Sequence, residues 1–286
     1  SAGPKPAGRP VSQHVSHHAP QHVRRMGIGV EHSDPDRPTG FSRRTVPGPT
    51  MQDSIDLTPS ILLRAYANGL FPMGHDNGDV HWYSPDPRAV LPLDAFHIPD
   101  NLDRRVRRRE FSVTSDVAFD RVIRACADRD RTWITPRIID AYTDLHRRGY
   151  AHSVEAWVVP EDAETAESPP HDAELAGGLY GVMLGGGFFG ESMFFTVSNA
   201  SKVTLVHLVR QLRAGGATLL DTQYSNPHLE QFGVVEISRD AYLEQLADAL
   251  TVHPDWWPLT DAEAADLNTP VDAFENAARR DRPPAS

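Results

Sequence analysis

Residues 188–202 read FFGESMFFTVSNASK, an apolar segment that contains a glutamate and is followed by the start of a helix. Glu191 and Ser192 stand between aromatic pairs, where the pattern otherwise predicts a strand buried in a sheet. An unpaired carboxylate is costly to bury, so Glu191 needs either a built partner or a cleft in which a ligand supplies one. The stretch therefore predicts both a central strand and a candidate functional residue.

The sequence on both sides of this stretch predicts an α+β fold. Before it, LAGGLYGVML and GGFFGESMFF have the pattern of two adjacent strands joined by a glycine turn at 185–187. After it, a helix with an apolar face ends at Gly215 and Gly216, and ATLLDTQ follows as a buried strand. Further strands are expected at 111–116, 152–159 and 234–238, and further helices at 117–127, 136–146, 227–232 and 239–250. This order predicts helices packed around a mostly antiparallel sheet.

Composition and turn signals divide the chain into segments. Residues 1–51 are rich in His and Pro and poor in large apolar residues, so we expect a disordered and dispensable leader. A small N-terminal α/β unit is expected at 52–96, with a helix capped by Thr58 and a strand–turn–strand element. The expected catalytic domain is 97–258, with an acidic loop insertion at 160–174 and a polar tail at 259–286.

The overall composition indicates a soluble globular protein of a reducing compartment. The chain has 286 residues, of which 40% are hydrophobic, and its single cysteine, Cys126, cannot form an intrachain disulfide. No apolar run is long enough for a transmembrane span, and the N-terminus lacks the apolar region of a signal peptide. We therefore expect a cytoplasmic location.

The charge is unevenly distributed along the chain. The formal net charge is −11, yet residues 101–150 carry twelve arginines against eight acidic residues. The densest basic run is RRVRRR, which begins at Arg104. Such a run forms either a solvated polar face or a patch that contacts the phosphates of a nucleic acid.

The element order resembles that of GNAT-like acyltransferases, which suggests acyl transfer. Enzymes of that fold that use coenzyme A hold its pyrophosphate on a glycine-rich loop before a helix. The corresponding junction here, TVSNASK, contains no glycine, so coenzyme A is an improbable donor.

A set of motifs carries a closer resemblance. LFPM, WYSPDPRAVLP, TWI, AYTDLHRRGYAHSVEAW, GGLYGV, GESMF, NASK and LLDTQ…HLEQFG occur within about residues 56–246. Their order and spacing resemble those of the leucyl/phenylalanyl-tRNA–protein transferase family. The resemblance implies transfer of Leu or Phe, with Met as a further candidate donor, from aminoacyl-tRNA to proteins that begin with Arg or Lys. It further implies an N-terminal degradation signal as the product, no cofactor, no metal and no membrane, and we expect a monomer.

The resemblance also assigns roles to polar residues. Glu191 would hold the cationic N-terminal residue of the acceptor, although a structural salt bridge to an internal arginine is the alternative. Asp221 and Gln223 lie two apart on one strand and so share a face. Gln223 would hydrogen-bond the acceptor's α-amine and Asp221 would raise its basicity, whereas a cap or turn role is the alternative for Asp221. Ser192 is rejected as a nucleophile, because GESMF is not G-x-S-x-G.

The resemblance assigns apolar and basic residues to the donor. Leu179, Phe188 and Leu205 would line the pocket for the donor's side chain, and composition alone makes them ordinary core residues. Trp133 would stack near the terminal adenosine of the tRNA. The basic residues that contact tRNA would be Arg104, Arg107 and Arg108.

Two other functions remain open at this point. One is a GNAT-fold tRNA-dependent transferase with a different acceptor, such as a cell-wall peptide. The other is a binding module that recognises tRNA or N-terminal residues without transferring anything. Glu191, Asp221 and Gln223 together argue against the second.

Overall fold

The structure is a computed structural model that describes residues 25–26, 57–75, 77–158 and 173–256. The expected polar tail, most of the expected acidic loop and all but two residues of the expected leader lie outside this part of the chain. The strands are β1 (Arg25–Met26), β2 (Phe71–Gly74), β3 (Val80–Tyr83), β4 (Arg88–Val90), β5 (Phe111–Ser115), β6 (Ala151–Val158), β7 (Leu175–Leu184), β8 (Gly187–Phe195), β9 (Leu219–Gln223) and β10 (Val235–Ile237). The helices are α1 (Pro59–Ala67), α2 (Asp100–Arg107), α3 (Phe119–Ala127), α4 (Pro136–Arg147), α5 (Ala200–Gly215), α6 (Pro227–Glu230) and α7 (Arg239–Ala249).

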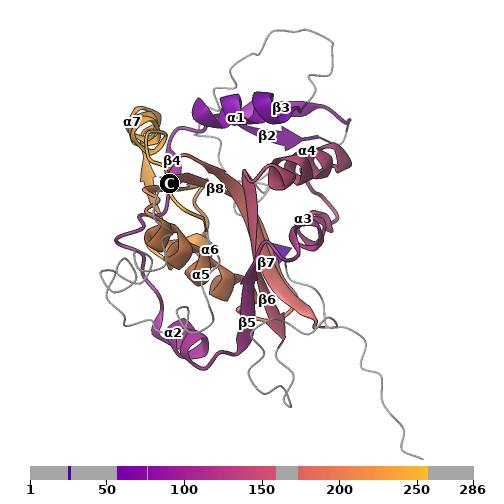
Figure 1. Ribbon diagram of the computed structural model, residues 1–286, viewed down its shortest axis with the longest axis vertical. Coiled ribbons are helices and arrows are strands. Elements are labelled where there is room, and N and C mark those ends of the chain that lie inside the picture. The colour runs from indigo at the N-terminus through magenta and orange to yellow at the C-terminus, as the bar shows by residue number, and fades with distance from the viewer. Residues whose placement is uncertain (1–24, 27–56, 76, 159–172, 257–286) are drawn as a thin grey trace, which may run out of the picture.

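One large sheet forms the centre of the fold, with the strand order β10-β4-β9-β8-β7-β6-β5 (Figure 1). All neighbours along this path are antiparallel except β8 and β9, which run parallel and are connected by α5. Strand β1 pairs with β8 at Phe194 and Met193. The fold is therefore α+β with a mixed, mostly antiparallel sheet, as the element order predicts.

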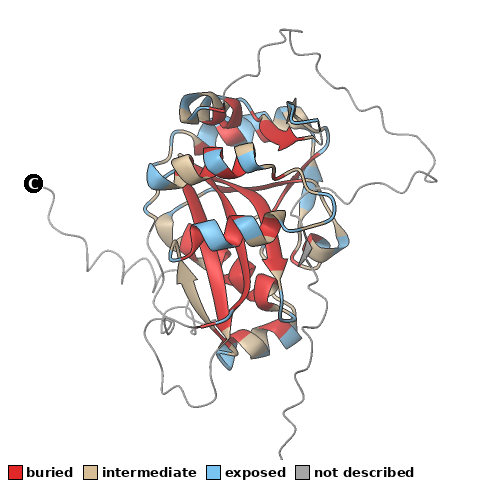
Figure 2. Ribbon diagram, turned by 90° about the vertical axis from the view of Figure 1, so that its right-hand side faces the viewer, coloured by how far each residue is buried: buried red, intermediate tan, exposed pale blue. Residues whose placement is uncertain are grey.

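Helices cover both faces of the sheet and create two apolar cores. Helix α5 packs on one face, whereas α3 and α4 pack on the other, where α1 and the small β2–β3 sheet complete the layer (Figure 1). Figure 2 shows the result: the central strands β6 to β9 are buried almost throughout, β3, β5 and β10 are mostly intermediate or exposed, and the other exposed residues lie on the outer sides of the helices and in loops. The core on the α1/α3/α4 side contains Tyr66, Tyr142 and Phe189, and the core on the α5 side contains Leu179, Phe188 and Leu205.

Local signals in the sequence explain most of the element boundaries. The hydroxyl of Thr58 accepts from the backbone N–H of Ile61, and Pro59 occupies the first helical position of α1, as expected. Helix α5 ends where Gly216 adopts a left-handed conformation at φ 80°. The turn between β7 and β8 is made by Gly185 and Gly186, of which Gly185 has φ 55°.

Two parts of the fold differ from the sequence interpretation. Strand β4 pairs with β9 and β10, so it belongs to the large sheet and only α1, β2 and β3 form the small N-terminal unit. The arginine-rich run lies mainly on a helix, α2, which the sequence pattern does not predict because only Leu102 and Val106 anchor it to the core.

A β-bulge interrupts the pairing of β8 with β7. Tyr180 pairs with Ser192 and Gly181 pairs with Gly190, which leaves Glu191 as an extra residue on β8. Both Glu191 and Ser192 consequently face the α1/α3/α4 layer, where Glu191 contacts Tyr66 and Ser192 accepts a hydrogen bond from Arg129. The bulge thus directs two consecutive polar side chains to the same face.

Candidate active site

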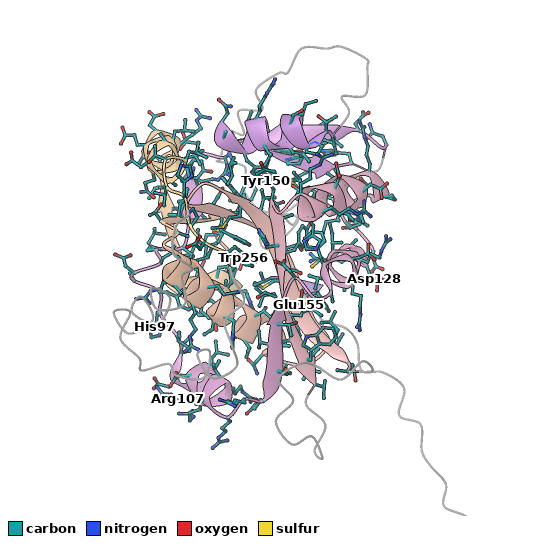
Figure 3. All side chains as sticks on the ribbon, viewed as in Figure 1. His97, Arg107, Asp128, Tyr150, Glu155 and Trp256 are labelled. Atoms are coloured by element: carbon teal, nitrogen blue, oxygen red, sulfur yellow. The ribbon has the colours of Figure 1, made fainter. Side chains whose placement is uncertain are left out.

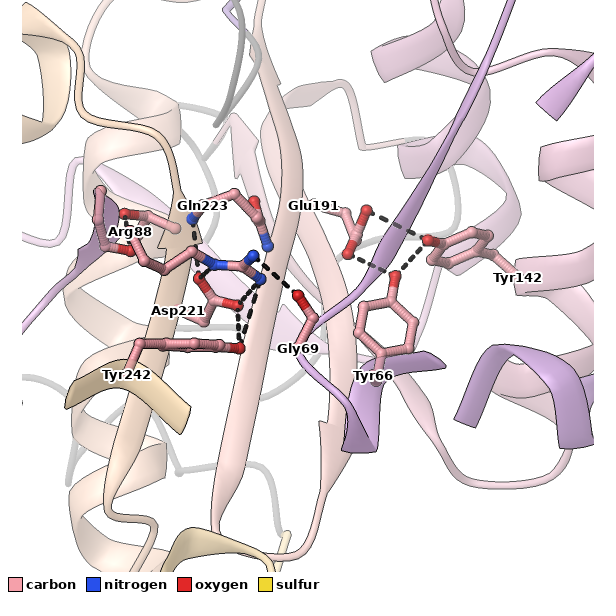
Figure 4. A network of polar contacts seen from close by, with 10 residues as sticks. Tyr66, Gly69, Arg88, Tyr142, Glu191, Asp221, Gln223 and Tyr242 are labelled. Carbon is pink, nitrogen blue, oxygen red and sulfur yellow. Dashed lines mark hydrogen bonds and ion pairs between the residues drawn. The ribbon is translucent and has the colours of Figure 1, made fainter. Parts of the chain in front are cut away.

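Glu191 is held by tyrosine hydroxyls rather than by a cation. Tyr66 of α1 donates to its Oε1 atom at 2.6 Å, and Tyr142 of α4 donates to its Oε2 atom at 3.2 Å (Figure 4). The two hydroxyls also hydrogen-bond each other. Glu191 is only 2% exposed, and no ion pair reaches it from the described residues. The structural salt bridge considered as the alternative is therefore absent from this part of the chain.

Proton counting around Glu191 favours the neutral carboxyl. The side chains of Glu191, Tyr66 and Tyr142 form a triangle of three oxygen–oxygen contacts, and each contact needs one proton. An ionised carboxylate leaves only the two tyrosine protons. A protonated carboxyl supplies the third if its O–H donates to Tyr142 in place of accepting from it, so that Tyr142 can donate to Tyr66. Burial, partly opposed by the two hydroxyl hydrogen bonds, raises the pKa of Glu191 from 4.5 to about 8. Burial, and after it the nearby Glu191 charge, also raises the pKa of both tyrosines.

Asp221 is fully engaged in a second buried network. Arg88 of β4 binds it in a bidentate manner, with Nε 2.9 Å from Oδ1 and Nη2 2.6 Å from Oδ2. Tyr242 of α7 donates to Oδ2 at 2.9 Å, and the backbone N–H of Gln223 donates to Oδ1 at 2.9 Å. Arg88 also donates to the backbone oxygen of Gly69 at 3.0 Å, which ties the turn after α1 to the sheet. The turn role considered as the alternative for Asp221 is thus present.

Gln223 ends β9 in an unusual backbone conformation. Its φ is 58°, in the left-handed region that a non-glycine residue rarely adopts. The hydrogen bond from its N–H to Asp221 closes this turn. The side chain is 3% exposed, and its Nε2 atom is buried without a hydrogen-bond partner among the described residues. A strained residue with a free buried donor is characteristic of a functional site.

The two networks meet where β8 and β9 separate. The last residue pair between these strands is Phe189 with Asp221, after which β8 continues to Phe195 and pairs with β1 at Met193 and Phe194. Glu191 and Gln223 each follow this last pair by two residues (Figure 4). The charges of Asp221 and Arg88 are close enough to act on the pKa of Glu191. Glu191, Asp221 and Gln223 therefore gather at one place, on the α1/α3/α4 face of the sheet.

The other predicted site residues lie elsewhere. Leu179, Phe188 and Leu205 belong to the opposite face, in the core beneath α5, and they are 0%, 0% and 1% exposed. Trp133 packs beside the small unit, where its backbone oxygen accepts from Gly74 at 3.0 Å. The structure thus brings the three polar residues together and places the three apolar residues across the sheet from them.

The predicted basic patch is remote from these networks. Arg104, Arg107 and Arg108 are exposed on α2 and the turn after it, at the end of the molecule opposite α1 (Figures 1 and 3). Arg107 also pairs with Asp103 one helical turn earlier, at 2.7 Å.

Sequence reasoning missed four residues of the networks. Tyr66 and Tyr142 read as apolar-face residues of two helices, and nothing local shows that their hydroxyls converge on Glu191. Arg88 reads as part of a turn, although an arginine next to apolar strand residues signals a buried ion pair. Tyr242 gives no such signal.

Comparisons with known proteins give the class of this protein and then its family. The family model described as "Leucyl/phenylalanyl-tRNA protein transferase" matches residues 90–247, and the model of its N-terminal domain matches residues 55–86. The leucyl/phenylalanyl-tRNA–protein transferase of Salinibacter ruber is 68% identical over 224 residues, which cover 78% of this chain and 93% of that protein. The one of Gloeobacter violaceus is 51% identical over 199 residues, covering 69% and 96%.

The fold and these matches define an aminoacyltransferase. The chain belongs to the leucyl/phenylalanyl-tRNA–protein transferase family. No helix in the described part of the chain is both long enough and apolar enough to cross a bilayer.

The neutral state of Glu191 predicts how stability depends on pH. The folded chain binds a proton at Glu191 between pH 4.5 and about 8 that the unfolded chain releases. The stabilisation of the folded state by this proton is complete below pH 4.5, and it is lost as the pH rises through about 8. Urea unfolding should show Glu191→Gln gaining stability relative to the parent by about 1.4 kcal/mol per pH unit across this window. The exposed Glu244→Gln is the control, and parallel profiles for parent and Glu191→Gln would contradict the assignment.

The Arg88–Asp221 pair predicts a large loss of stability when one partner is removed. Asp221→Asn leaves the guanidinium buried and uncompensated, which should cost about 3–5 kcal/mol in denaturant unfolding. Arg124→Ala, which breaks an exposed pair with Asp120, should leave the unfolding midpoint close to that of the parent. Joint replacement of Arg88 by Met and Asp221 by Leu should restore part of the loss. Equal unfolding midpoints for Asp221→Asn and the parent would show that the pair contributes nothing.

Proposed function

We propose that this chain transfers Leu or Phe from aminoacyl-tRNA to proteins whose first residue is Arg or Lys, which marks them for degradation. The observation that carries this acceptor preference is Glu191, a buried carboxyl that has hydroxyl partners but no ion pair within the described residues. The parallel β8–β9 pair within an otherwise antiparallel sheet supports the GNAT-like acyltransferase fold that the element order suggests. Because aminoacyl-tRNA is a cytoplasmic substrate, we place the reaction in the cytoplasm.

Glu191 suits the capture of a cationic side chain because its charge can be created on binding. A guanidinium or ammonium group next to the carboxyl stabilises the ionised form, so acceptor binding lowers the pKa from about 8 and releases a proton. The ionised form also frees one hydroxyl contact of the tyrosine triangle, since only two protons then remain. Tyr66 and Tyr142 therefore hold the carboxylate in place while the acceptor supplies its counterion.

The reaction itself needs alignment more than acid–base power. The acceptor's neutral α-amine attacks the ester carbonyl, a C–N bond forms, the C–O bond to the tRNA ribose breaks, and the leaving hydroxyl gains a proton. The Nε2 atom of Gln223 has no partner among the described residues and is a donor, so it could stabilise the ester carbonyl oxygen, which becomes negative during attack. The contact of Gln223 with the α-amine that is expected from the sequence stays a prediction beside this role.

Asp221 acts in this proposal by positioning Gln223. Its hydrogen bonds within the described residues go to Arg88, Tyr242 and the N–H of Gln223, which favours a positioning role, and the proton-acceptor role expected from the sequence stays a prediction. We therefore keep Asp221 in the site as the residue that fixes the left-handed turn of β9.

The donor's tRNA is proposed to lie on α2. The helix presents Arg104 and Arg107 at its exposed side, and Arg108 follows at its end, which suits phosphate contacts far from the reacting ester. Trp133 is then the candidate stacking partner for the terminal adenosine, because it lies beside the small unit near the Glu191 network.

Glu191→Gln tests acceptor capture. The change keeps the shape of the side chain and removes the charge that forms on binding. It should lower kcat/KM for a peptide that begins with Arg by roughly ten- to a hundredfold, mainly through KM, and leave aminoacyl-tRNA affinity unchanged. Transfer is scored by the mass of the extended peptide.

Glu155→Gln is the matched control for that experiment. Glu155 is also fully buried and receives hydrogen bonds from the hydroxyls of Thr114 and Ser153, but it lies on β6, away from the parting of β8 and β9. Its variant should keep the parent KM for the acceptor. If both variants lose activity equally, or if Glu191→Gln transfers normally, acceptor capture by Glu191 is wrong.

Joint replacement of Arg104, Arg107 and Arg108 by Ala tests the tRNA surface. Loss of three phosphate contacts should reduce the slope of log affinity against log salt by about 2 to 3. Joint replacement by Ala of Arg124, Arg147 and Arg148, which are exposed on α3 and at the end of α4, is the charge-matched control. If the slope of log affinity against log salt is unchanged in the triple variant, the arginine-rich run of α2 is only a solvated polar surface.

A further inference from the structure

The sheet face beneath α5 has a row without side chains. Gly181 of β7 and Gly190 of β8 pair directly across the two strands, and the rows on either side carry Leu179 with Met193 and Met183 with Phe188. A Cβ atom placed on Gly181 would lie 2.4 Å from the Cε1 atom of Phe188, so the Phe188 ring lies over the glycine backbone. The ring thus fills the space that the glycine row leaves open.

Donor binding in this place requires the Phe188 ring to move. Leu179, Phe188 and Leu205 are almost completely buried in one apolar core. On the same face of β7, Gly177 lies against Ala200 of α5, whereas Gly181 lies under the Phe188 ring. The final position of the Phe188 ring therefore fixes the size of any apolar side chain that enters there.

Trp256, which follows α7 in the sequence, packs against the Phe188 ring. Its ring lies nearly parallel to Phe188, at a centroid distance of 5.9 Å and an angle of 12°. It also stacks on His152 of β6 at 4.3 Å, the residue that pairs with Gly181. The indole N–H donates to Asp116 at 2.8 Å, and Nδ1 of His152 donates to the same carboxylate oxygen.

The segment before Trp256 is fixed by close backbone contacts. A Cβ atom on Gly215 would lie 2.2 Å from the backbone oxygen of Asp255, and one on Gly186 would lie 2.9 Å from Cβ of Val252. The N–H of Asp255 donates to the oxygen of Gly215 at 3.1 Å. The glycines of the β7–β8 turn and of the end of α5 therefore let residues 252–255 pack closely against them. These contacts fix the position of Trp256, which follows directly.

We propose that Trp256 is a specificity-determining positioning residue, which sets the donor side chain that the chain accepts by limiting how far the Phe188 ring can swing. Trp256 makes no contact with the reacting groups and acts only through Phe188. The proposal rests on the proposed function, in which Phe188 lines the donor pocket. A fixed indole favours the smaller Leu, whereas loss of the indole lets the ring move farther and favours Phe.

The test compares two donors in the full-length chain. kcat/KM is measured with Leu-tRNA and with Phe-tRNA for the parent, Trp256→Ala and Trp256→Phe, using one peptide that begins with Arg. Trp256→Ala should raise the Phe-to-Leu ratio by about tenfold, the scale of size discrimination in an apolar pocket. Trp256→Phe keeps a stacking ring without the N–H, so its ratio should fall between those of the parent and Trp256→Ala.

Trp157→Phe is the matched control. The Trp157 indole also donates a hydrogen bond at 2.8 Å, to Thr114, but it lies in the other core and has no contact with Phe188. A variant that only loses structure has a lower kcat/KM with both Leu-tRNA and Phe-tRNA, so its Phe-to-Leu ratio stays at the parent value. We expect this result for Trp157→Phe. Ratios within twofold of the parent for both Trp256 variants would overturn the proposal, and Trp256→Phe decides the matter if Trp256→Ala does not fold. Transfer of either amino acid by the parent upholds the proposed function whatever the Trp256 variants do.

Discussion

The arrangement of the active site depends on one extra residue in β8. If β8 paired with β7 without a bulge, Glu191 and Ser192 would point to opposite faces of the sheet, and the alternation beyond them would be reversed. With the bulge, Glu191 faces α1 and α4, and Met193 returns to the α5 side with Leu179. A carboxyl can then be buried among tyrosine hydroxyls while the strand on both sides of it remains apolar core.

This constraint separates the proposed tasks of the site onto the two faces of a single sheet. The polar networks of Glu191 and of Arg88 with Asp221 lie on the side of the small N-terminal unit, and they tie α1, β4 and α7 to the central strands. The apolar residues proposed for the donor lie under α5, where Trp256 closes the layer. Phe188 directly precedes the last β8–β9 pair, Phe189 with Asp221, so the reacting ester and amine are proposed to meet near that pair.

Sequence reasoning predicted what is encoded locally. Caps such as Thr58, glycine stops such as Gly216 and the alternation of strands determine the element order, and most observed boundaries follow it. It placed β4 in the small unit because WYSPDPRAVLP reads as a local hairpin, whereas long-range pairing with β9 and β10 decides where the strand lies. Helix α2 was missed because charged residues dominate its sequence.

The candidate site was predicted only in part, because some of its residues stand out in the local sequence and others come from distant segments. Glu191, Asp221 and Gln223 are conspicuous as polar residues within buried strands, and the structure brings them together. Their partners Tyr66, Tyr142 and Arg88 come from residues far away in the sequence, and only the packing of α1, α4 and β4 reveals them. The unpaired state of the Gln223 amide likewise depends on the tertiary fold.

The most direct test of this account is the ionisation of Glu191, followed by carbon NMR of a chain labelled at its glutamate side chains and assigned with Glu191→Gln. The account predicts a carboxyl that titrates near pH 8 in the free chain and at a clearly lower pH when a peptide that begins with Arg is bound. A peptide that begins with a neutral residue should leave the titration unchanged. An ordinary carboxyl titration in the free chain, or the same titration with and without the Arg peptide, would contradict the claim that Glu191 waits uncharged for the acceptor.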